Sequence, residues 1–313
     1  MNAPQSWGAR VDAYLSYRRS LGFSLTAEYY YLPQFARFAE AQHAPRLTAQ
    51  LAIDWACTSK RQTPITRAFR IIRLRGFAKY CQKFDPDGEI PPLGVFGRTR
   101  RRLVPHIYTE REIAELLEAT SRLRPRDGLR PLTYRTIYGL LASSGLRIGE
   151  AIRLRRTDVD LDGGVLSIRH TKRHKNRFVP VHSSTARALE AYAQQRNTKV
   201  LRPRSDHFFL LDNGNPPTRA RICCGLQRLA NQLGWKPRGD YLQHRVQDVR
   251  HTFIVRSTLR AFEEGLNVDQ VVLTLSRYVG HNNVADTYWY VTGIPELMAI
   301  AAERFHNYSK VLP

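Results

Sequence analysis

The sequence has few cysteines and no long apolar run. Its four cysteines, Cys57, Cys81, Cys223 and Cys224, form neither a CxxC pair nor a set with the spacing of metal ligands. Neither a disulfide framework nor a metal site is therefore expected, and the thiols are predicted to be buried and reduced. No stretch approaches the ~20 apolar residues that cross a bilayer, and the start MNAPQSWGARVDAYL lacks the regions of a secretory signal. We expect a cytoplasmic protein with no membrane partner.

Acidic residues are scarce relative to basic ones. The chain of 313 residues has 49 Lys and Arg against 27 Asp and Glu, a net charge of +22. A field of this size attracts polyanions, so nucleic acid is the expected partner. The basic residues are spread along the chain, as in RIIRLRGFAKY and RHTKRHKNRF, so folded surfaces must carry them. The length and a hydrophobic content of 42% suffice for two domains, each with its own core.

The first 92 residues predict a small helical bundle. Four segments have apolar residues spaced three to four positions apart: 7–23, 25–42, 48–59 and 64–84. The last segment also contains a row of arginines that we predict to face outward: Arg67, Arg70 and Arg73. Its apolar residues would face the bundle: Phe69, Ile72 and Leu74. Such a row suits a DNA backbone, although an ordinary solvated basic face explains it equally well.

Residues 93–106 have the composition of a linker, because glycine, proline and a basic cluster occur there without sustained periodicity. A second domain, 107–313, begins with Thr109 and Glu112 in capping-box spacing and continues with further helical patterns. Two β-rich runs, 165–170 and 177–181, surround a basic turn. The sequence therefore predicts a mainly α protein with a small antiparallel β-sheet. Its candidate DNA contacts outside the bundle are Arg100, Arg101, Arg102, Arg173 and Lys175.

Two arginines of the second domain occur where an anion is expected. In SSGLRIGE, Gly145 can end one helix in a left-handed cap, which places Arg147 at the N-terminus of the next helix with Glu150 on its first turn. On this segment alone, a surface salt bridge explains this pair slightly better. In VQDVRHTFIVRSTL, Arg250 lies close to an apolar stripe and needs an anionic partner. That partner could be Asp248 or Glu150.

A third segment, VGHNNVADTYWYV, has His281 after a glycine and Tyr290 nine positions later. Tyr288 falls on another helical face and Trp289 has no nucleophilic group, so both are predicted to pack. Together with a lysine in the basic turn, the three segments resemble, in order, the motifs of the tyrosine recombinase (phage integrase) family. The resemblance covers roughly residues 105–300, and the N-terminal helices resemble the family's core-binding domain more weakly.

The resemblance implies a role for each matched residue. Arg147 and Arg250 would bind the scissile phosphate, Glu150 would support Arg147, and Lys172 would match the hairpin lysine better than Lys175. The expected catalytic set is Arg147, Lys172, Arg250, His281 and Tyr290, with Tyr290 as the nucleophile. Its supporting residues would be Glu150, Gln247 and His251. The chain departs from the family at Gln247, where a histidine is usual. His244 could supply the missing imidazole, but it is more readily a surface residue or a DNA-backbone contact.

By this resemblance the enzyme would cut and rejoin DNA through a 3′-phosphotyrosyl link, without a metal or other cofactor. Its partners would be double-stranded DNA and further copies, as a tetramer on paired sites, or related recombinases. It would serve a mobile element and be associated with the nucleoid. The competing functions are those of a non-catalytic DNA-binding regulator on the same scaffold, a type I topoisomerase, and a metal-dependent transposase or nuclease. The last needs converging acidic residues, and the sequence has no coherent acidic set.

Overall fold

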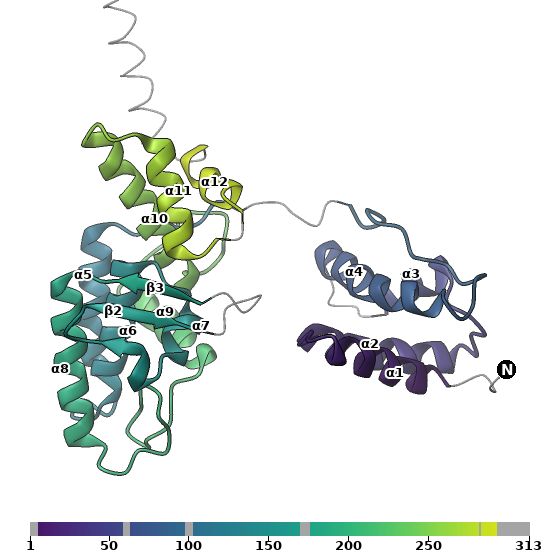
Figure 1. Cartoon of the computed structure of the whole chain (residues 1–313), viewed down its shortest axis with the longest axis horizontal. Coiled ribbons are helices and arrows are strands. Elements are labelled where there is room, and N and C mark those ends of the chain that lie inside the picture. The colour runs from purple at the N-terminus through teal and green to yellow at the C-terminus, as the bar shows by residue number, and fades with distance from the viewer. Residues whose placement is uncertain (1–5, 59–62, 98–102, 170–175, 282, 293–313) are drawn as a thin grey trace, which may run out of the picture. The chain divides into compact units, whose positions relative to one another are not determined.

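The computed structural model describes residues 6–58, 63–97, 103–169, 176–281 and 283–292. Figure 1 shows helices and one small sheet, and the chain divides into two compact units, Met1–Arg102 and Leu103–Pro313. The predicted fold class, mainly α with a small antiparallel sheet, is confirmed. None of the helices in the described part is long and apolar enough to cross a membrane.

The described residues of the first unit form four helices around an aromatic core. They are α1 (Trp7–Ser20), α2 (Thr26–Ala41), α3 (Ala49–Ala56) and α4 (Pro64–Cys81). Phe35 of α2 lies at the centre, with its ring centroid 5.7 Å from that of Trp7 and 5.4 Å from that of Trp55, both in edge-to-face geometry. Phe77 of α4 joins the same group. Ser6, Thr48 and Thr63 cap three of the helices through their side chains.

Helix α4 buries a different face from the predicted one. Ile71 and Leu74 are buried, whereas Phe69 and Ile72 are exposed and Arg70 is only 4% exposed. The outward orientation predicted for Arg70 is wrong, because its guanidinium reaches the C-terminal end of α3. There it donates to the Trp55 carbonyl at 2.7 Å and so satisfies a helix-end acceptor.

The other two arginines of the row remain nearer the surface. Arg67 is half-buried, and Arg73 is paired with Glu28 at 2.8 Å, with 40% of its side chain exposed. The cysteine prediction also needs correction. All four thiols are free, but only Cys81 is buried, Cys223 is half-buried, and the other two are exposed.

The second unit packs helices against a three-stranded antiparallel sheet in the order β1-β2-β3. The strands are β1 (Val159–Asp160), β2 (Val165–Ile168) and β3 (Arg177–Pro180). Strands β2 and β3 are the two predicted runs, shortened, and Leu166 pairs with Val179 in their register. Both side chains are fully buried, and they join the main core with residues of α6.

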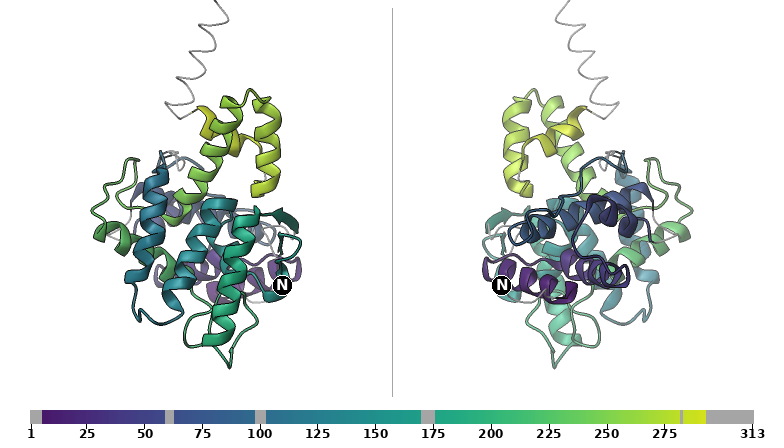
Figure 2. Two further views of the ribbon diagram at one scale, coloured as in Figure 1. Left: turned by 90° about the vertical axis from the view of Figure 1, so that its left-hand side faces the viewer. Right: turned by 90° about the vertical axis from the view of Figure 1, so that its right-hand side faces the viewer.

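The second unit also contains helices along its whole length. They are α5 (Glu110–Ala119), α6 (Arg130–Ser144), α7 (Ile148–Arg153), α8 (Ser183–Lys199), α9 (Arg219–Gln232), α10 (Val246–Glu263), α11 (Val268–Val279) and α12 (Ala285–Thr292), with two 3₁₀ turns, η1 (Thr120–Arg122) and η2 (Arg156–Asp158). The predicted capping box of Thr109 and Glu112 starts α5. Helices α10, α11 and α12 gather at one end of the unit (Figures 1 and 2). At the start of the unit, the Val104 amide donates a hydrogen bond to the Asp240 carboxylate. The nearby His106 is buried.

Candidate active site

The site is built where three helix ends meet in the second unit. Helix α6 ends at Gly145, which has the predicted left-handed conformation with φ of 60°. Helix α11 ends at Gly280, also left-handed with φ of 70°. The chain after Gly145 leads into Arg147, the N-cap of α7, and the chain after Gly280 leads into His281. Two glycine caps thus bring Arg147 and His281 to neighbouring turns.

Arg147 is oriented by the protein and still reaches the surface. Its Nη1 donates to Glu150 Oε1 at 2.9 Å and its Nη2 donates to the Gly280 carbonyl at 2.8 Å. The side chain is 39% exposed. A guanidinium has five N–H groups in a planar fork, so it can also bind an incoming anion.

Glu150 is a buried carboxylate between two arginines. Its Oε1 and Oε2 accept from Arg177 Nη1 at 3.2 Å and Nη2 at 2.8 Å, and Arg147 binds the same group. Burial raises the pKa of the Glu150 carboxyl, but the hydrogen bonds and charges of Arg177 and Arg147 outweigh burial and hold the pKa at about 2. Glu150 is therefore ionised at neutral pH.

Arg250 lies on α10 and is only 2% exposed, in agreement with its predicted place near the apolar stripe. Its Nη1 donates to the Gly145 carbonyl and its Nη2 to the Val279 carbonyl, each at 2.7 Å. These acceptors lie at the negative ends of α6 and α11. The carboxylates expected to pair with Arg250 bond to other arginines: Asp248 binds Arg245 and Glu150 binds Arg147 and Arg177.

The two phosphate-binding candidates therefore share one short segment. Arg147 binds the carbonyl of Gly280 and Arg250 binds the carbonyl of the preceding residue, Val279. Arg250 also binds Gly145, two residues before Arg147. The geometry brings together both arginines and the residue that follows Gly280, which is His281.

His281 is neutral at physiological pH. Its Nδ1 lies 2.7 Å from the hydroxyl of Thr287, a buried residue of α12. Burial, together with the charges of the neighbouring arginines Arg250, Arg147 and Arg177, lowers the pKa of the imidazole to about 3. Thr287 fixes the ring against the helix that carries Tyr290. Sequence reasoning had no signal for Thr287, because a threonine three residues before a tyrosine is common in helices.

The supporting residues of α10 lie close to this group. His251 is three residues after Asp248 and 3.9 Å from it, and burial, with the charges of Arg245, Arg250 and His281, lowers its pKa to about 3. Gln247 is half-buried on the first turn of α10. His244 is buried and packs edge-on against His106, with ring centroids 4.6 Å apart, so the expected surface position is wrong.

Part of the predicted set lies outside the described residues. This holds for the turn residues Lys172, Arg173 and Lys175, for the linker residues Arg100, Arg101 and Arg102, and for the tail after α12. The backbone of Tyr290 lies in α12, and its side chain is likewise outside the part that the structure describes. Trp289 packs on a small cluster with Ile254, as predicted. Tyr288, also predicted to pack, is 37% exposed and donates its hydroxyl to Asp269 at 2.6 Å.

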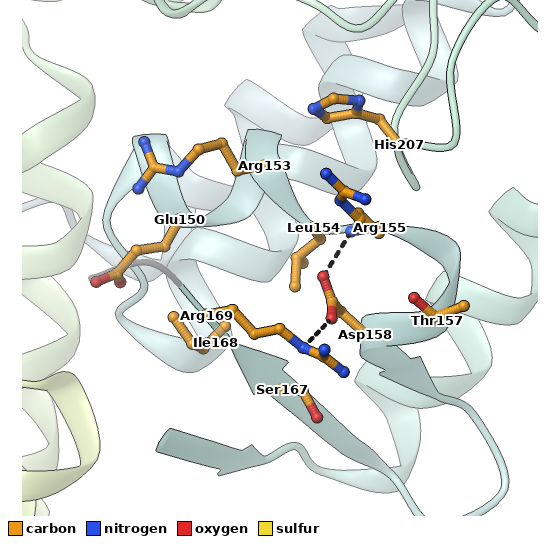
Figure 3. Close-up of a pocket in the computed structure, with 10 residues that line it drawn as sticks. All are labelled: Glu150, Arg153, Leu154, Arg155, Thr157, Asp158, Ser167, Ile168, Arg169 and His207. Carbon is orange, nitrogen blue, oxygen red and sulfur yellow. Dashed lines mark hydrogen bonds and ion pairs between the residues drawn. The ribbon is translucent and has the colours of Figure 1, made fainter. Parts of the chain in front are cut away.

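A pocket of about 260 Å³ lies beside the arginine cluster, between α7, η2 and β2 (Figure 3). Asp158 is buried in it: its Oδ2 accepts from the Arg155 amide at 3.0 Å, and its Oδ1 forms an ion pair with Arg169 Nε at 2.8 Å. Figure 3 shows the Glu150 carboxylate turned away from the Asp158 and Arg169 pair.

Sequence reasoning missed Arg177, the first residue of β3. It connects Glu150 of α7 with the end of α11, because its Nε also donates to the Tyr278 carbonyl at 2.9 Å. The sequence offered only a weak signal, an arginine at the start of the second β run. Its partners are 27 and 101 positions away, so no local spacing could have found them.

The fold is that of DNA recombinases of known structure. A XerH site-specific recombinase, bound to a palindromic difH substrate in a post-cleavage complex, matches with a TM-score of 0.67 and 17% identity, over 90% of this chain and 80% of that chain. The Tn1549 transposon integrase, in complex with transposon right end DNA, matches with a TM-score of 0.64 and 17% identity, over 95% and 99% of the two chains.

Sequence comparison defines the family. The phage integrase family model matches residues 107–294. An integrase/recombinase of Sinorhizobium fredii, y4rB, is 38% identical over 301 residues, which cover 95% of this chain and 96% of that protein. Tyrosine recombinase XerA of Thermococcus kodakarensis is 26% identical over 211 residues, which cover 67% of this chain and 66% of that one. The chain belongs to the phage integrase family.

Proposed function

We propose that this protein is a site-specific DNA recombinase that cleaves and rejoins DNA strands for a mobile element. The observation that carries the proposal is the convergence of Arg147 and Arg250 on the adjacent carbonyls of Gly280 and Val279. It places two fixed guanidinium groups beside His281, at the turn that leads to the helix of Tyr290. Two arginine forks suit the oxygens of one phosphodiester.

In this reaction the Tyr290 hydroxyl attacks the scissile phosphorus and passes its proton to a solvent water molecule as the new bond forms. The bond to the 5′ oxygen breaks, and Lys172 supplies the proton that this oxygen gains. Arg147 and Arg250 stabilise the charge that develops on the non-bridging oxygens. With Nδ1 accepting from Thr287, the Nε2–H of His281 donates to one of the same oxygens.

Rejoining is the reverse step, with a 5′ hydroxyl from another strand attacking the 3′-phosphotyrosyl link. The link conserves the bond energy, so the proposal requires neither a metal nor a nucleotide cofactor. We further propose that the protein acts as a tetramer on paired sites, alone or with related recombinases. The tail from residue 296 would dock on a neighbouring copy, and Arg67, Arg73, the linker arginines and the turn residues Arg173 and Lys175 would contact the DNA backbone.

The test is covalent capture on a nicked suicide substrate, on which the cleaved end diffuses away. Tyr290→Phe should bind DNA and form no adduct, because phenylalanine has no hydroxyl to attack phosphorus. Tyr288→Phe is the matched control on the same helix and should form the adduct at the wild-type rate. Adduct formation by Tyr290→Phe would refute the assigned nucleophile, and DNA binding without any adduct in the wild type would favour a non-catalytic regulator.

A further inference from the structure

We propose that Arg177 is a positioning residue for strand cleavage: it holds Glu150 in the orientation that aims Arg147 and fixes the backbone turn that leads into His281. The inference rests on the proposed function, since it concerns the same arginine cluster. It assigns a role to the first residue of β3, which lies on the sheet and not on the helices that carry the recognised motifs.

The guanidinium of Arg177 is committed to protein acceptors. Its three nitrogens donate to the two carboxylate oxygens of Glu150 and to the Tyr278 carbonyl, at 2.8 to 3.2 Å. Only 14% of its side chain is exposed. A planar fork with all three nitrogens in use orients its partners firmly, and it is poorly placed to bind a phosphate itself.

Arg177 acts on Arg147 through an oxygen of Glu150 that both arginines bind. Glu150 Oε1 accepts from Nη1 of Arg177 and from Nη1 of Arg147. The carboxylate is thus held from the sheet side by Arg177 and holds Arg147 on its other side. Without Arg177, the Glu150 carboxylate would lose its donors on the sheet side and keep only those of Arg147, its backbone amide and Nη1. The direction of the Arg147 fork would then be less firmly fixed.

The effect on His281 passes through the backbone. Arg177 binds the carbonyl of Tyr278, and Arg147 binds the carbonyl of Gly280, so the end of α11 is held by two side chains. Gly280 is also in close contact with Arg177: a Cβ atom added there would lie 2.7 Å from its Nη1. Glycine is therefore required both by the left-handed φ and by the guanidinium that packs on it.

The first experiment compares single-turnover adduct formation by Arg177→Met and Arg177→Lys with that of the wild type. Arg177→Met removes all three hydrogen bonds and should slow cleavage by roughly 10²-fold, the scale expected for a small misplacement of a reacting group. A lysine ammonium cannot bind Glu150 bidentately and the Tyr278 carbonyl together, so Arg177→Lys should give an intermediate rate. Arg155→Met, which breaks an exposed pair with Asp206, is the matched control and should cleave at the wild-type rate.

The second experiment separates positioning from DNA contact and from general stability. The salt dependence of DNA affinity should be the same for Arg177→Met and the wild type, because the number of phosphates neutralised does not change. In a Glu150→Gln background, Arg177→Met should reduce the rate of adduct formation much less than it does in the wild type. The reason is that both substitutions act through the same carboxylate. Adduct rates are compared at a temperature at which every variant is shown to be folded.

A pH profile gives a readout that a purely structural role would not change. The groups that face Glu150 are the charged Arg147 on its own helix, the charged Arg177 on β3 and the titratable imidazole of His281 beyond Gly280. Arg177 is the main hydrogen-bond donor to Glu150, so its loss should raise the pKa of the Glu150 carboxyl. The acid limb of the pH profile of the cleavage rate should therefore move to higher pH in Arg177→Met.

The outcomes are distinct. An unchanged cleavage rate in Arg177→Met, a flatter salt dependence, or full additivity with Glu150→Gln would each overturn the positioning role while leaving the proposed function intact. If the wild type forms no adduct, the proposed function has failed, and the role of Arg177 in cleavage fails with it.

Discussion

Three histidines, of which His106 is buried and His251 and His281 are half-buried, make the second unit sensitive to mild acid. Burial is the largest cause that lowers the pKa of His106 to about 4 and those of His251 and His281 to about 3. In the unfolded chain each has a pKa near 6.5. Below pH 6.5 the unfolded state therefore binds protons that the folded state excludes, and stability falls as the pH drops from 6.5 towards these folded values.

The predicted size of this effect is measurable. At pH 5 each such histidine lowers the free energy of unfolding by up to about 2 kcal/mol relative to pH 7, because a pKa shift of one unit corresponds to about 1.4 kcal/mol. Glu112 and Glu150, with pKa values of about 2, keep their charge in this window. Urea unfolding between pH 5 and 7 should show a shallower pH dependence for His251→Gln than for the wild type.

The exposed His182 provides the comparison for His251. The variant His182→Asn keeps a side-chain acceptor at the N-cap of α8 and should retain the full pH dependence. A dependence equally steep in His251→Gln would mean that His251 does not contribute to it.

The residues that sequence reasoning placed correctly are those fixed by their immediate neighbours. A glycine before Arg147 and another before His281 predict helix ends, and both were observed. Arg177 and Arg70 depend instead on carbonyls and carboxylates supplied by remote segments. Charge alone predicted that Arg70 faces water, because the sequence does not show which carbonyls at the end of α3 are open to it.

Among the helices, the crossing of α6 and α10 sets the position of Arg250. A Cβ at Gly145 would lie 2.4 Å from Cδ1 of Phe253 on α10, and its φ of +60° is strained for other residues. Arg250, three residues before Phe253, binds the Gly145 carbonyl. The close approach of the two helices and the orientation of this arginine thus depend on the same glycine.

Gly145→Ala should therefore lower both stability and cleavage. Strain and overpacking together should cost about 2–4 kcal/mol in urea unfolding, and adduct formation should fall because Arg250 is displaced. Gly265→Ala is the matched control, since Gly265 has a φ of +73° and nothing within 4 Å of the added Cβ. It should cost only the backbone strain, roughly 1 kcal/mol, and leave cleavage unchanged. Equal losses in the two variants would show that contact with Phe253 is unimportant.

The helices of the first unit, α5 to α7, α10 and the two longer strands followed from periodicity and caps. Helices α8 and α9 were not predicted individually, and β1 was not predicted at all. Two residues carry no periodic signal, and β1 exists only because Val159 pairs with Leu166. The buried face of α4 was also missed, because two apolar stripes are possible when Phe69, Ile71, Ile72 and Leu74 lie so close together. Packing against α2 and α3 selects the stripe with Ile71 and Leu74.

For the whole molecule, the net charge of +22 follows directly from the sequence and belongs to no single contact. Binding to DNA releases the counterions of every phosphate that is neutralised, so affinity depends on the number of contacts. Each unit carries arginines proposed to make such contacts, and others, such as Arg70, are structural. The salt dependence of DNA affinity distinguishes DNA-contacting arginines from structural ones. Only the removal of a DNA-contacting arginine changes the number of phosphates neutralised.

We therefore expect the DNA affinity of the full chain to fall steeply and linearly with salt on logarithmic axes. Replacing Arg100, Arg101 and Arg102 with glutamine should reduce the slope by up to about 3, close to one for each phosphate that is no longer neutralised. Arg70→Leu removes the same kind of charge from a buried position, where it binds the Trp55 carbonyl, and should lower stability while leaving the slope unchanged in folded protein. A nearly flat dependence in the wild type would argue against extensive backbone contact. A slope reduced by Arg70→Leu as much as by removal of one linker arginine would show that overall charge, and not placed contacts, governs binding.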